Sequence, residues 1–207
     1  MLAEARDLGF LGPGPVEAHL DHASGFAEVV RGLARSAGTQ GAPWPNQAAD
    51  LGSGAGLPGL PLALAFPDCA WILVESSVRR AAFLRRAVEQ LGLGSRVVVA
   101  EARAEAVGRD SARRGRFSLV VARSFGPPAV VAECAAPLLG VGGRAVISEP
   151  PGGAPSRWPT SGLASLGMVP EATVSAHGWA YQAVRQEELC SDRYPRRIGI
   201  PVKRPLF

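Results

Sequence analysis

The sequence predicts an α/β domain in which a mostly parallel sheet carries helices on both faces and ends in an antiparallel edge. Three observations predict it. Short apolar runs alternate with amphipathic segments of helical length from residue 48 onward, a glycine-rich turn follows the first run, and two strand-like stretches come in succession near the carboxyl terminus. The 207 residues are 47% hydrophobic and 19% charged, which is typical of a globular chain and excludes a disordered one.

The elements follow from local composition. Continuous apolar runs are typical of strands covered on both faces, and they are expected at 48–51, 71–75, 96–100, 117–122 and 144–148. Helices are expected at 58–66, 78–91 and 129–139. Pro58 suits a first helical turn, and Gly92 suits the end of the second helix. The antiparallel edge is expected around 168–175 and 181–186.

We therefore divide the chain into three parts. Residues 1–46 are a short amino-terminal helical cap and a Gly- and Pro-rich linker that ends at Trp44-Pro45. Residues 47–190 are the α/β domain, and residues 191–207 are a basic, proline-punctuated tail that is expected to lie extended on the surface.

Composition also limits compartment and partners. The three cysteines are far apart and odd in number, which predicts reduced thiols in a cytoplasmic protein and no metal site. The most apolar stretch is broken by Pro61, Pro67 and Asp68, so no membrane span is expected. A net charge of +4 suits a phosphate-rich partner.

The strongest local signal is the segment DLGSGAGLPG at 50–59, between a strand and a helix. Gly52, Gly54 and Gly56 let the backbone turn sharply and approach a ligand, and the following helix points free N–H groups at it. Asp50 closes the strand where an acid can attract an amino group of the ligand. The pattern fits S-adenosylmethionine.

Two other interpretations of this turn remain open. Gly54, Gly56 and Gly59 also satisfy the G-x-G-x-x-G fingerprint of dinucleotides, although Leu57-Pro58 crowds the helix start where a pyrophosphate needs bare amides. A purely structural turn is the third possibility. Glu75, at the end of the second strand, can accept hydrogen bonds from both hydroxyls of an adenosine ribose, which either cofactor carries.

Longer segments make the resemblance specific. DLGSGAGLPGLPLALAFPD, ESSVRRAAFLRR, EARAEAV, VARSF and the tail RYPRRIGIPVKRPL resemble the glucose-inhibited division protein B family, over roughly 50–123 plus the tail. These bacterial enzymes use S-adenosylmethionine to methylate guanine N(7) of 16S ribosomal RNA. The resemblance implies a Rossmann-like class I methyltransferase fold, that cofactor, and 16S rRNA or the small ribosomal subunit, rather than DNA, as the partner.

The resemblance also implies a set of site residues. The family's donor site falls on Gly52, Leu57, Ala104, Glu105 and Arg123 of this chain. Arg123 follows a parallel strand and so faces the crevice where such sheets bind ligands, which makes it a substrate candidate too. A surface cation and an exposed helix-start acid are the alternatives for Arg123 and Glu105. No proton-transfer residue is predicted, because guanine N(7) offers a lone pair without a proton.

Basic residues of the tail are the expected RNA contacts, with phosphates held by Arg196, Arg197 and Lys203. The arginines of the helix at 78–91 are expected to form a solvated face. The sequence does not determine the oligomeric state.

Two departures from the family pattern keep other functions open. The cap reads AHLDHASGF where the family carries Arg-His and later Asp-Ser, so we expect histidines satisfied within the cap. The fifth strand ends in Ser148-Glu149-Pro150 where the family has Lys-Gly. The alternatives are a methyltransferase of another RNA or a small molecule, and an inactive donor-binding protein associated with RNA.

Overall fold

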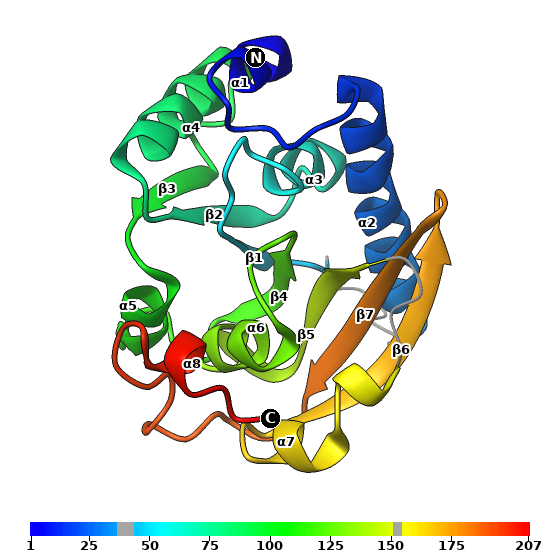
Figure 1. Ribbon diagram of the computed structural model, residues 1–207, viewed down its shortest axis with the longest axis vertical. Coiled ribbons are helices and arrows are strands. Elements are labelled where there is room, and N and C mark those ends of the chain that lie inside the picture. The colour runs from blue at the N-terminus through cyan, green and yellow to red at the C-terminus, as the bar shows by residue number, and fades with distance from the viewer. Residues whose placement is uncertain (37–43, 151–154) are drawn as a thin grey trace.

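A computed structural model describes residues 1–36, 44–150 and 155–207 of the chain (Figure 1). Most of the expected linker before Trp44 and the loop at 151–154 lie outside the described residues. The strands are β1 (Gln47–Leu51), β2 (Ala70–Glu75), β3 (Val97–Glu101), β4 (Phe117–Ala122), β5 (Leu139–Glu149), β6 (Met168–Ala176) and β7 (Trp179–Gln186). The helices of the α/β alternation are α3 (Gly59–Ala65), α4 (Val78–Gln90), α5 (Ala104–Arg109) and α6 (Pro128–Ala135).

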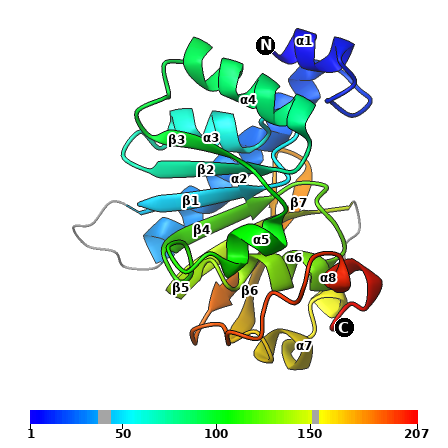
Figure 2. The ribbon, with the colours of Figure 1, turned by 90° about the vertical axis from the view of Figure 1, so that its left-hand side faces the viewer.

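The strands form one sheet in the order β3-β2-β1-β4-β5-β7-β6, and Figure 2 shows β3, β2, β1, β4 and β5 side by side in this order. β1 to β5 run parallel, and β7 pairs antiparallel with both β5 and β6. Strand order reverses direction between β1 and β4, so a crevice opens outside their carboxyl ends, where open α/β sheets bind ligands. The predicted fold class and antiparallel edge are confirmed.

Each face of the sheet packs its own hydrophobic core. One core joins the sheet to α3, α4 and the amino-terminal helices α1 (Leu2–Asp7) and α2 (Val16–Ser36). The other joins it to α5, α6 and the short helix α7 (Thr160–Ala164). Successive residues of a strand point to opposite faces. Ala49 and Leu51 of β1 accordingly face α5 and α6, whereas Ala48 and Asp50 face α2, α3 and α4.

The amino-terminal part contains a longer helix than expected. The sequence predicts short helices there, but α2 has 21 residues and packs against α3 and the strands β5, β6 and β7. The Tyr181 hydroxyl donates to the carbonyl of His22 at 2.7 Å, and the Tyr181 ring meets Phe26 at 4.8 Å. A Cβ at Gly25 would lie 2.1 Å from the Tyr181 hydroxyl oxygen, so only glycine permits this approach. The antiparallel edge thereby fixes α2 on the sheet.

The tail is anchored to the domain rather than simply extended over it. Arg114 donates to the carbonyls of Tyr194 at 2.7 Å and Cys190 at 2.9 Å. The chain then forms a short helix, α8 (Ile200–Lys203), which packs against α6. The sequence predicted a basic tail that lies extended on the surface. Its anchoring could not be predicted from local composition, because its partner Arg114 lies far away in the sequence.

Two further expectations concern cysteines and membranes. Cys69, Cys134 and Cys190 are free thiols, which agrees with the expected reduced state, and all three are buried, which the sequence did not predict. Among the described helices, none combines the length and apolarity that crossing a bilayer requires.

Candidate active site

A pocket of about 110 Å³ opens at the carboxyl ends of β1 and β2, beside the amino terminus of α5. We call it the glycine pocket. Four of the predicted donor-site residues line it together with several that the sequence did not single out: Gly52, Glu75, Ala104, Glu105, Ser76, Phe125 and Val202. Gly52 follows β1, Glu75 ends β2, and Ala104 and Glu105 lie in α5 after β3. The parallel sheet brings them together, because the carboxyl ends of these strands lie side by side.

The glycines of the turn have different tasks. Gly52, Gly54 and Gly56 all have positive φ, at 69°, 55° and 88°, a region that side chains rarely adopt. A Cβ at Gly52 would lie 2.7 Å from Cδ2 of Phe125, so this glycine admits Phe125 to the pocket wall. A Cβ at Gly56 would instead meet Leu60 and Leu84 in the core, so Gly56 serves the packing of the turn on its helices.

Glu75 holds the glycine-rich turn and the start of α4 together. Its Oε2 accepts the N–H of Gly54 at 3.0 Å and its Oε1 accepts the N–H of Ser77 at 2.8 Å. The side chain is only 6% exposed and lines the glycine pocket. Because a carboxylate has about four lone-pair sites, roughly two remain for a ligand. Glu75 is therefore fixed in position with acceptor capacity left over.

Asp50 is not among the residues that line the glycine pocket, and its buried Oδ1 has no hydrogen-bond partner among the described residues. Its side chain is fully buried, and Oδ2 accepts the N–H of Gly59 at 3.0 Å at the start of α3. Gly59 allows this contact, since a Cβ there would meet the same oxygen at 2.6 Å. Alternation along β1 turns Asp50 to the α3 face, so the structure gives it a part in joining strand to helix. Burial raises the pKa of Asp50 to about 7 against the lowering effect of the Gly59 N–H.

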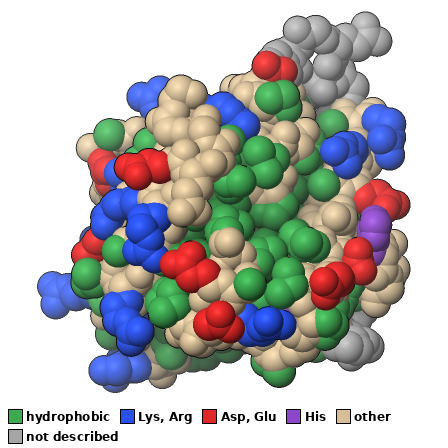
Figure 3. Space-filling model, turned by 90° about the horizontal axis from the view of Figure 1, so that it is seen from above, with side chains coloured by type: hydrophobic (Ala, Val, Ile, Leu, Met, Phe, Trp, Pro, Cys, Tyr) green, Lys and Arg blue, Asp and Glu red, His purple; other side chains and the backbone are tan. Residues whose placement is uncertain are grey.

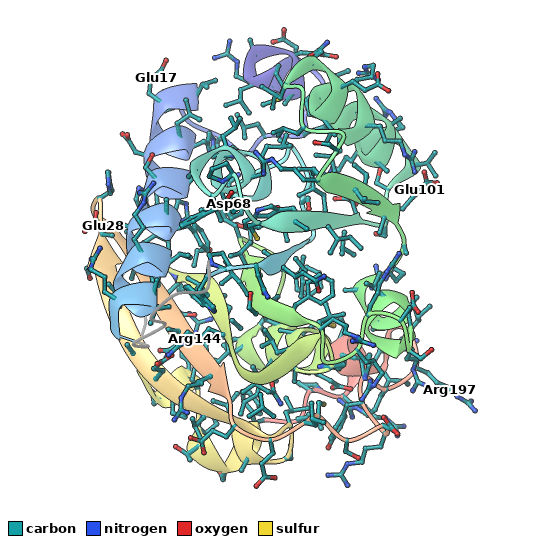
Figure 4. All side chains as sticks on the ribbon, turned by 180° about the vertical axis from the view of Figure 1, so that it is seen from behind. Glu17, Glu28, Asp68, Glu101, Arg144 and Arg197 are labelled. Carbon is teal, nitrogen blue, oxygen red and sulfur yellow. The ribbon has the colours of Figure 1, made fainter. Side chains whose placement is uncertain are left out.

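This burial predicts a pH dependence of folding. The pKa of Asp50 rises from 3.8 to about 7 on folding, so the folded state holds its proton more tightly. The contribution of Asp50 to the free energy of unfolding should therefore be largest below about pH 4 and should fall as the pH rises toward 7. Asp50→Asn should lack this loss and gain stability relative to wild type across that window. Urea denaturation at several pH values measures it, with the exposed Asp68→Asn (Figure 4) as control; parallel profiles for Asp50→Asn and wild type would contradict the burial.

Glu105 connects the pocket to the tail. Its Oε1 accepts the N–H of Gly199 at 3.0 Å, and Nε of Arg103 lies 3.5 Å from its Oε2. Burial would raise the pKa of Glu105, but the Gly199 N–H and the Arg103 guanidinium outweigh it and lower the pKa below its usual value. Val202 of α8 lines the same pocket. The tail thus forms part of the pocket wall, which the sequence did not predict.

Arg123 and Leu57 lie outside the described wall of the glycine pocket. Leu57 is 2% exposed within the core under α3 and α4. Arg123 donates to Nδ1 of His19 at 3.3 Å, and Nε2 of His19 lies 3.2 Å from the carbonyl oxygen of Gly12. Because a guanidinium can only donate and a carbonyl can only accept, Nδ1 of His19 is the acceptor and Nε2 the donor in these contacts. The prediction of satisfied cap histidines is confirmed for His19 but is wrong for His22, whose buried Nε2 has no hydrogen-bond partner among the described residues. Arg123 connects the carboxyl end of β4 to the cap.

A second pocket, of about 300 Å³, lies beside the first and shares Phe125 with it. We call it the tryptophan pocket; its wall includes His22, Phe125, Glu149, Arg157, Trp158 and Trp179. His22 stacks on Trp179 with ring centroids 4.4 Å apart. Burial, and then the charge of Arg123, lower the pKa of His22 to about 4, so this ring is neutral at physiological pH.

Glu149, the departure at the end of β5, is compensated within the fold. Arg157 donates to its Oε2 at 2.8 Å, and the indole Nε1 of Trp158 donates to its Oε1 at 3.1 Å. An uncompensated acid would repel RNA phosphate, but the guanidinium offsets this charge. The presence of Glu149 at the strand end where the family carries a lysine therefore does not by itself exclude an RNA substrate.

The tail cations separate into two kinds. Arg196 donates from its Nε and Nη2 to the fully buried carboxylate of Glu133 at 2.9 Å and 2.6 Å, and its backbone N–H binds the same group at 2.8 Å. Arg196 is thus engaged inside the protein, contrary to the phosphate contact expected of it. Arg197 and Lys203 are exposed, and Arg197 projects from the body in Figure 4.

Comparison with known proteins agrees with this arrangement. The sequence model of the family described as rRNA small subunit methyltransferase G matches residues 38–149. The ribosomal RNA small subunit methyltransferase G of Rubrobacter xylanophilus is 39% identical over 174 residues, which cover 78% of this chain and 65% of that protein. The protein of that name from Synechococcus elongatus is 35% identical over 179 residues, 79% of this chain and 70% of the relative. The chain thus spans about two thirds of the length of these relatives.

Solved structures share the fold. A putative sarcosine dimethylglycine methyltransferase from Galdieria sulphuraria superposes with a TM-score of 0.61 at 12% identity, covering 78% of this chain and 85% of that one. The putative methyltransferase yhhF from Escherichia coli gives 0.57 at 18% identity, covering 86% and 89%. At such identity the likeness concerns the fold alone. The family match and the two relatives identify the sequence itself: the chain belongs to the rRNA small subunit methyltransferase G family.

Proposed function

We propose that this protein transfers a methyl group from S-adenosylmethionine to N(7) of a guanine in 16S rRNA, in the cytoplasm. The observation that carries the proposal is the glycine pocket at the point where strand order reverses, with the tryptophan pocket directly beside it. One pocket suits a nucleoside donor and the other an aromatic acceptor. The curated relatives are named for methylation of small-subunit ribosomal RNA.

The residues of the glycine pocket fit the donor. Gly52 has no side chain to obstruct a ligand, and Glu75 keeps acceptor sites for ribose hydroxyls. Glu75 and Glu105 bring two buried carboxylates to the wall, which favours a cationic sulfonium ligand. When bound, the donor supplies an electrophilic methyl group on its sulfonium. We assign the binding to Gly52, Glu75, Ala104 and Glu105 of the pocket wall, and to Gly54, whose N–H is bound to Glu75.

The acceptor needs alignment rather than a base. Guanine N(7) carries a lone pair and no proton, so the protein has only to hold the base at near-attack distance, an effect worth ~7–11 kcal/mol. Phe125 lies in the wall of both pockets and thus marks where they meet. Its apolar ring helps to keep water out of the junction. We assign the placing of the acceptor to Phe125 and to Arg123 at the end of β4.

The RNA contact is assigned to Arg197 and Lys203, whose side chains are exposed on the tail. Each phosphate that they meet releases a condensed counterion. The view from the side of α1 shows apolar side chains gathered in the middle of the surface and cations toward its margin (Figure 3). That face therefore lacks a continuous basic stripe.

We retain residues 47–190 as the methyltransferase domain, with residues 1–46 as cap and linker and residues 191–207 as the basic tail.

The test offers the protein labelled donor with three acceptors: 30S subunits that lack the modification, naked 16S rRNA, and a metabolite extract. Label at guanine N(7) in rRNA supports the proposal. Label only in small molecules would replace it with a different acceptor, and donor binding without transfer to any acceptor would indicate an inactive RNA-associated protein. Digestion of the labelled rRNA to nucleosides identifies the methylated base.

Glu75→Gln tests the donor site separately. The variant is expected to bind S-adenosylhomocysteine about 1–3 kcal/mol more weakly, because charged hydrogen bonds to the ribose are lost. Calorimetric titration measures the dissociation constant. Glu101→Gln is the matched control, because Glu101 is the register partner of Glu75 on β3 but pairs with Arg85 at the surface. Equal affinities for both variants would remove Glu75 from the site.

A further inference from the structure

We propose that the tryptophan pocket binds the acceptor base and that Glu149 selects guanine by accepting hydrogen bonds from its Watson–Crick edge. This inference rests on the proposed function, since it names the acceptor subsite of the same enzyme. It assigns the selection of the base to an acid that departs from the family pattern.

The pocket is built from elements that are distant in sequence. Glu149 ends β5, Trp158 follows the short 3-10 helix at Pro155–Arg157, Trp179 begins β7 and His22 comes from α2. The His22 and Trp179 rings stack on each other with an interplanar angle of 10°, so a base can stack only on an outer face of this pair and not between the two rings. Flat aromatic walls are how proteins hold single-stranded bases, by stacking. The volume of about 300 Å³ is at the lower end of the range for small-molecule pockets.

Glu149 has unused capacity to accept hydrogen bonds. The residue is 7% exposed, so it is buried except toward the pocket that it lines. Oε2 accepts from Arg157 and Oε1 from the Trp158 indole, one donor to each oxygen. A carboxylate has about four lone-pair sites, so about two remain. The Arg157 guanidinium and the Trp158 indole fix the carboxylate in orientation before any ligand binds.

Guanine is the base that matches two carboxylate oxygens with about one unused lone pair each. Its Watson–Crick edge presents N1–H and the exocyclic N2 amino group side by side, two adjacent donors. Adenine offers a lone pair at N1, uracil and cytosine offer acceptors beside their donors, and each would place a lone pair against the carboxylate. A site built to bind N–H groups rejects analogues that lack them, because its own buried acceptor is left unpaired.

This placement also leaves N(7) in a usable position. N(7) lies on the opposite edge of the purine from N1 and N2. A guanine whose Watson–Crick edge meets Glu149 therefore directs N(7) away from β5. Phe125, which the two pockets share, connects the tryptophan pocket to the glycine pocket. Selection of the base and presentation of the nucleophile thus occupy opposite ends of one pocket.

The experiment compares guanosine 5′-monophosphate with inosine 5′-monophosphate, which lacks only the N2 amino group. Calorimetric titration is done with saturating S-adenosylhomocysteine, so that the glycine pocket is filled. Wild-type protein should bind the guanosine nucleotide at least about tenfold more tightly. Glu149→Gln should lose most of this preference. Glu171→Gln should keep it, because Glu171 is likewise paired with an arginine, Arg144 at 2.8 Å in the middle of β5, but neither residue lines the tryptophan pocket.

Equal binding of the two nucleotides to wild type, or a preference that survives in Glu149→Gln, would overturn the inference. Binding of S-adenosylhomocysteine by Glu149→Gln shows that the variant is folded, so that a lost preference can be assigned to the carboxylate. Labelling of 30S subunits is measured in parallel. Transfer to rRNA without a guanosine preference would leave the proposed function in place and refute the role of Glu149. A guanosine preference that depends on Glu149, without transfer to rRNA, would support the role of Glu149 and refute the proposed function.

Discussion

Gly52→Val is expected to abolish binding of S-adenosylhomocysteine, the demethylated donor, while the protein still folds. Gly52 has a φ of 69°, which a branched side chain adopts only with strain. The new Cβ would also lie 2.7 Å from Phe125, in a pocket of about 110 Å³. The side chain must therefore displace Phe125 or fill the space meant for the ligand. Calorimetric titration should detect no binding.

Gly92→Val is the matched control for this experiment. Gly92 follows α4 with a φ of 67°, and nothing lies within 4 Å of a Cβ there. It should suffer comparable backbone strain and retain full affinity for the ligand. If Gly52→Val bound the ligand like wild type, the glycine-rich turn would have no part in the donor site. Gly54→Val is a milder test of the pocket, since its Cβ would lie 3.7 Å from the nearest atom, the Gly52 carbonyl oxygen.

Arg196→Met is expected to lower the free energy of unfolding by about 3–5 kcal/mol, the range for removing one partner of a buried ion pair. Glu133 is 0% exposed and takes three of its hydrogen bonds from Arg196. Methionine keeps the apolar stem of the side chain but leaves the carboxylate with a single N–H donor. Urea denaturation followed by circular dichroism measures the loss.

Arg197→Met provides the comparison for this variant. Arg197 is the next residue and is exposed, so its replacement should change stability by less than about 0.5 kcal/mol. Equal stabilities of the two variants would show that the tail does not depend on the Arg196–Glu133 pair. Because Val202 of the same tail lines the glycine pocket and the Gly199 N–H holds Glu105, Arg196→Met should also weaken donor binding at temperatures where the variant is still folded.

Local patterns were sufficient for most of the sheet. The strand expected at 117–122 coincides with β4, and the expected helix at 58–66 exceeds α3 by one residue at each end. The expected helix at 129–139 is longer than α6, because the chain after Ala135 turns and joins β5 at Leu139. Apolar residues around a Gly-rich turn suit a helix or a strand. Pairing with β4, which begins at Leu139, makes this segment part of a strand.

Side-chain partners were harder to predict, as Asp50 shows. The sequence places an acid at the end of β1, next to the glycines, which suggested a ligand contact. Whether it faces the ligand or α3 depends on the alternation along the strand and on the absence of a side chain at Gly59. The same holds for Arg196, whose partner Glu133 lies on a helix far away in sequence. Composition cannot distinguish a solvated arginine from a paired one.

The amino-acid sequence by itself determined the fold class, the glycine-rich turn and Glu75 at the adjoining strand end, because strand periodicity and glycine chemistry are local properties. Only the tertiary structure decided that Phe125 joins two pockets, that the tail completes one of them and that Glu149 is compensated by Arg157 and Trp158. These relations depend on how distant segments pack, and packing between elements leaves no periodic trace in the sequence.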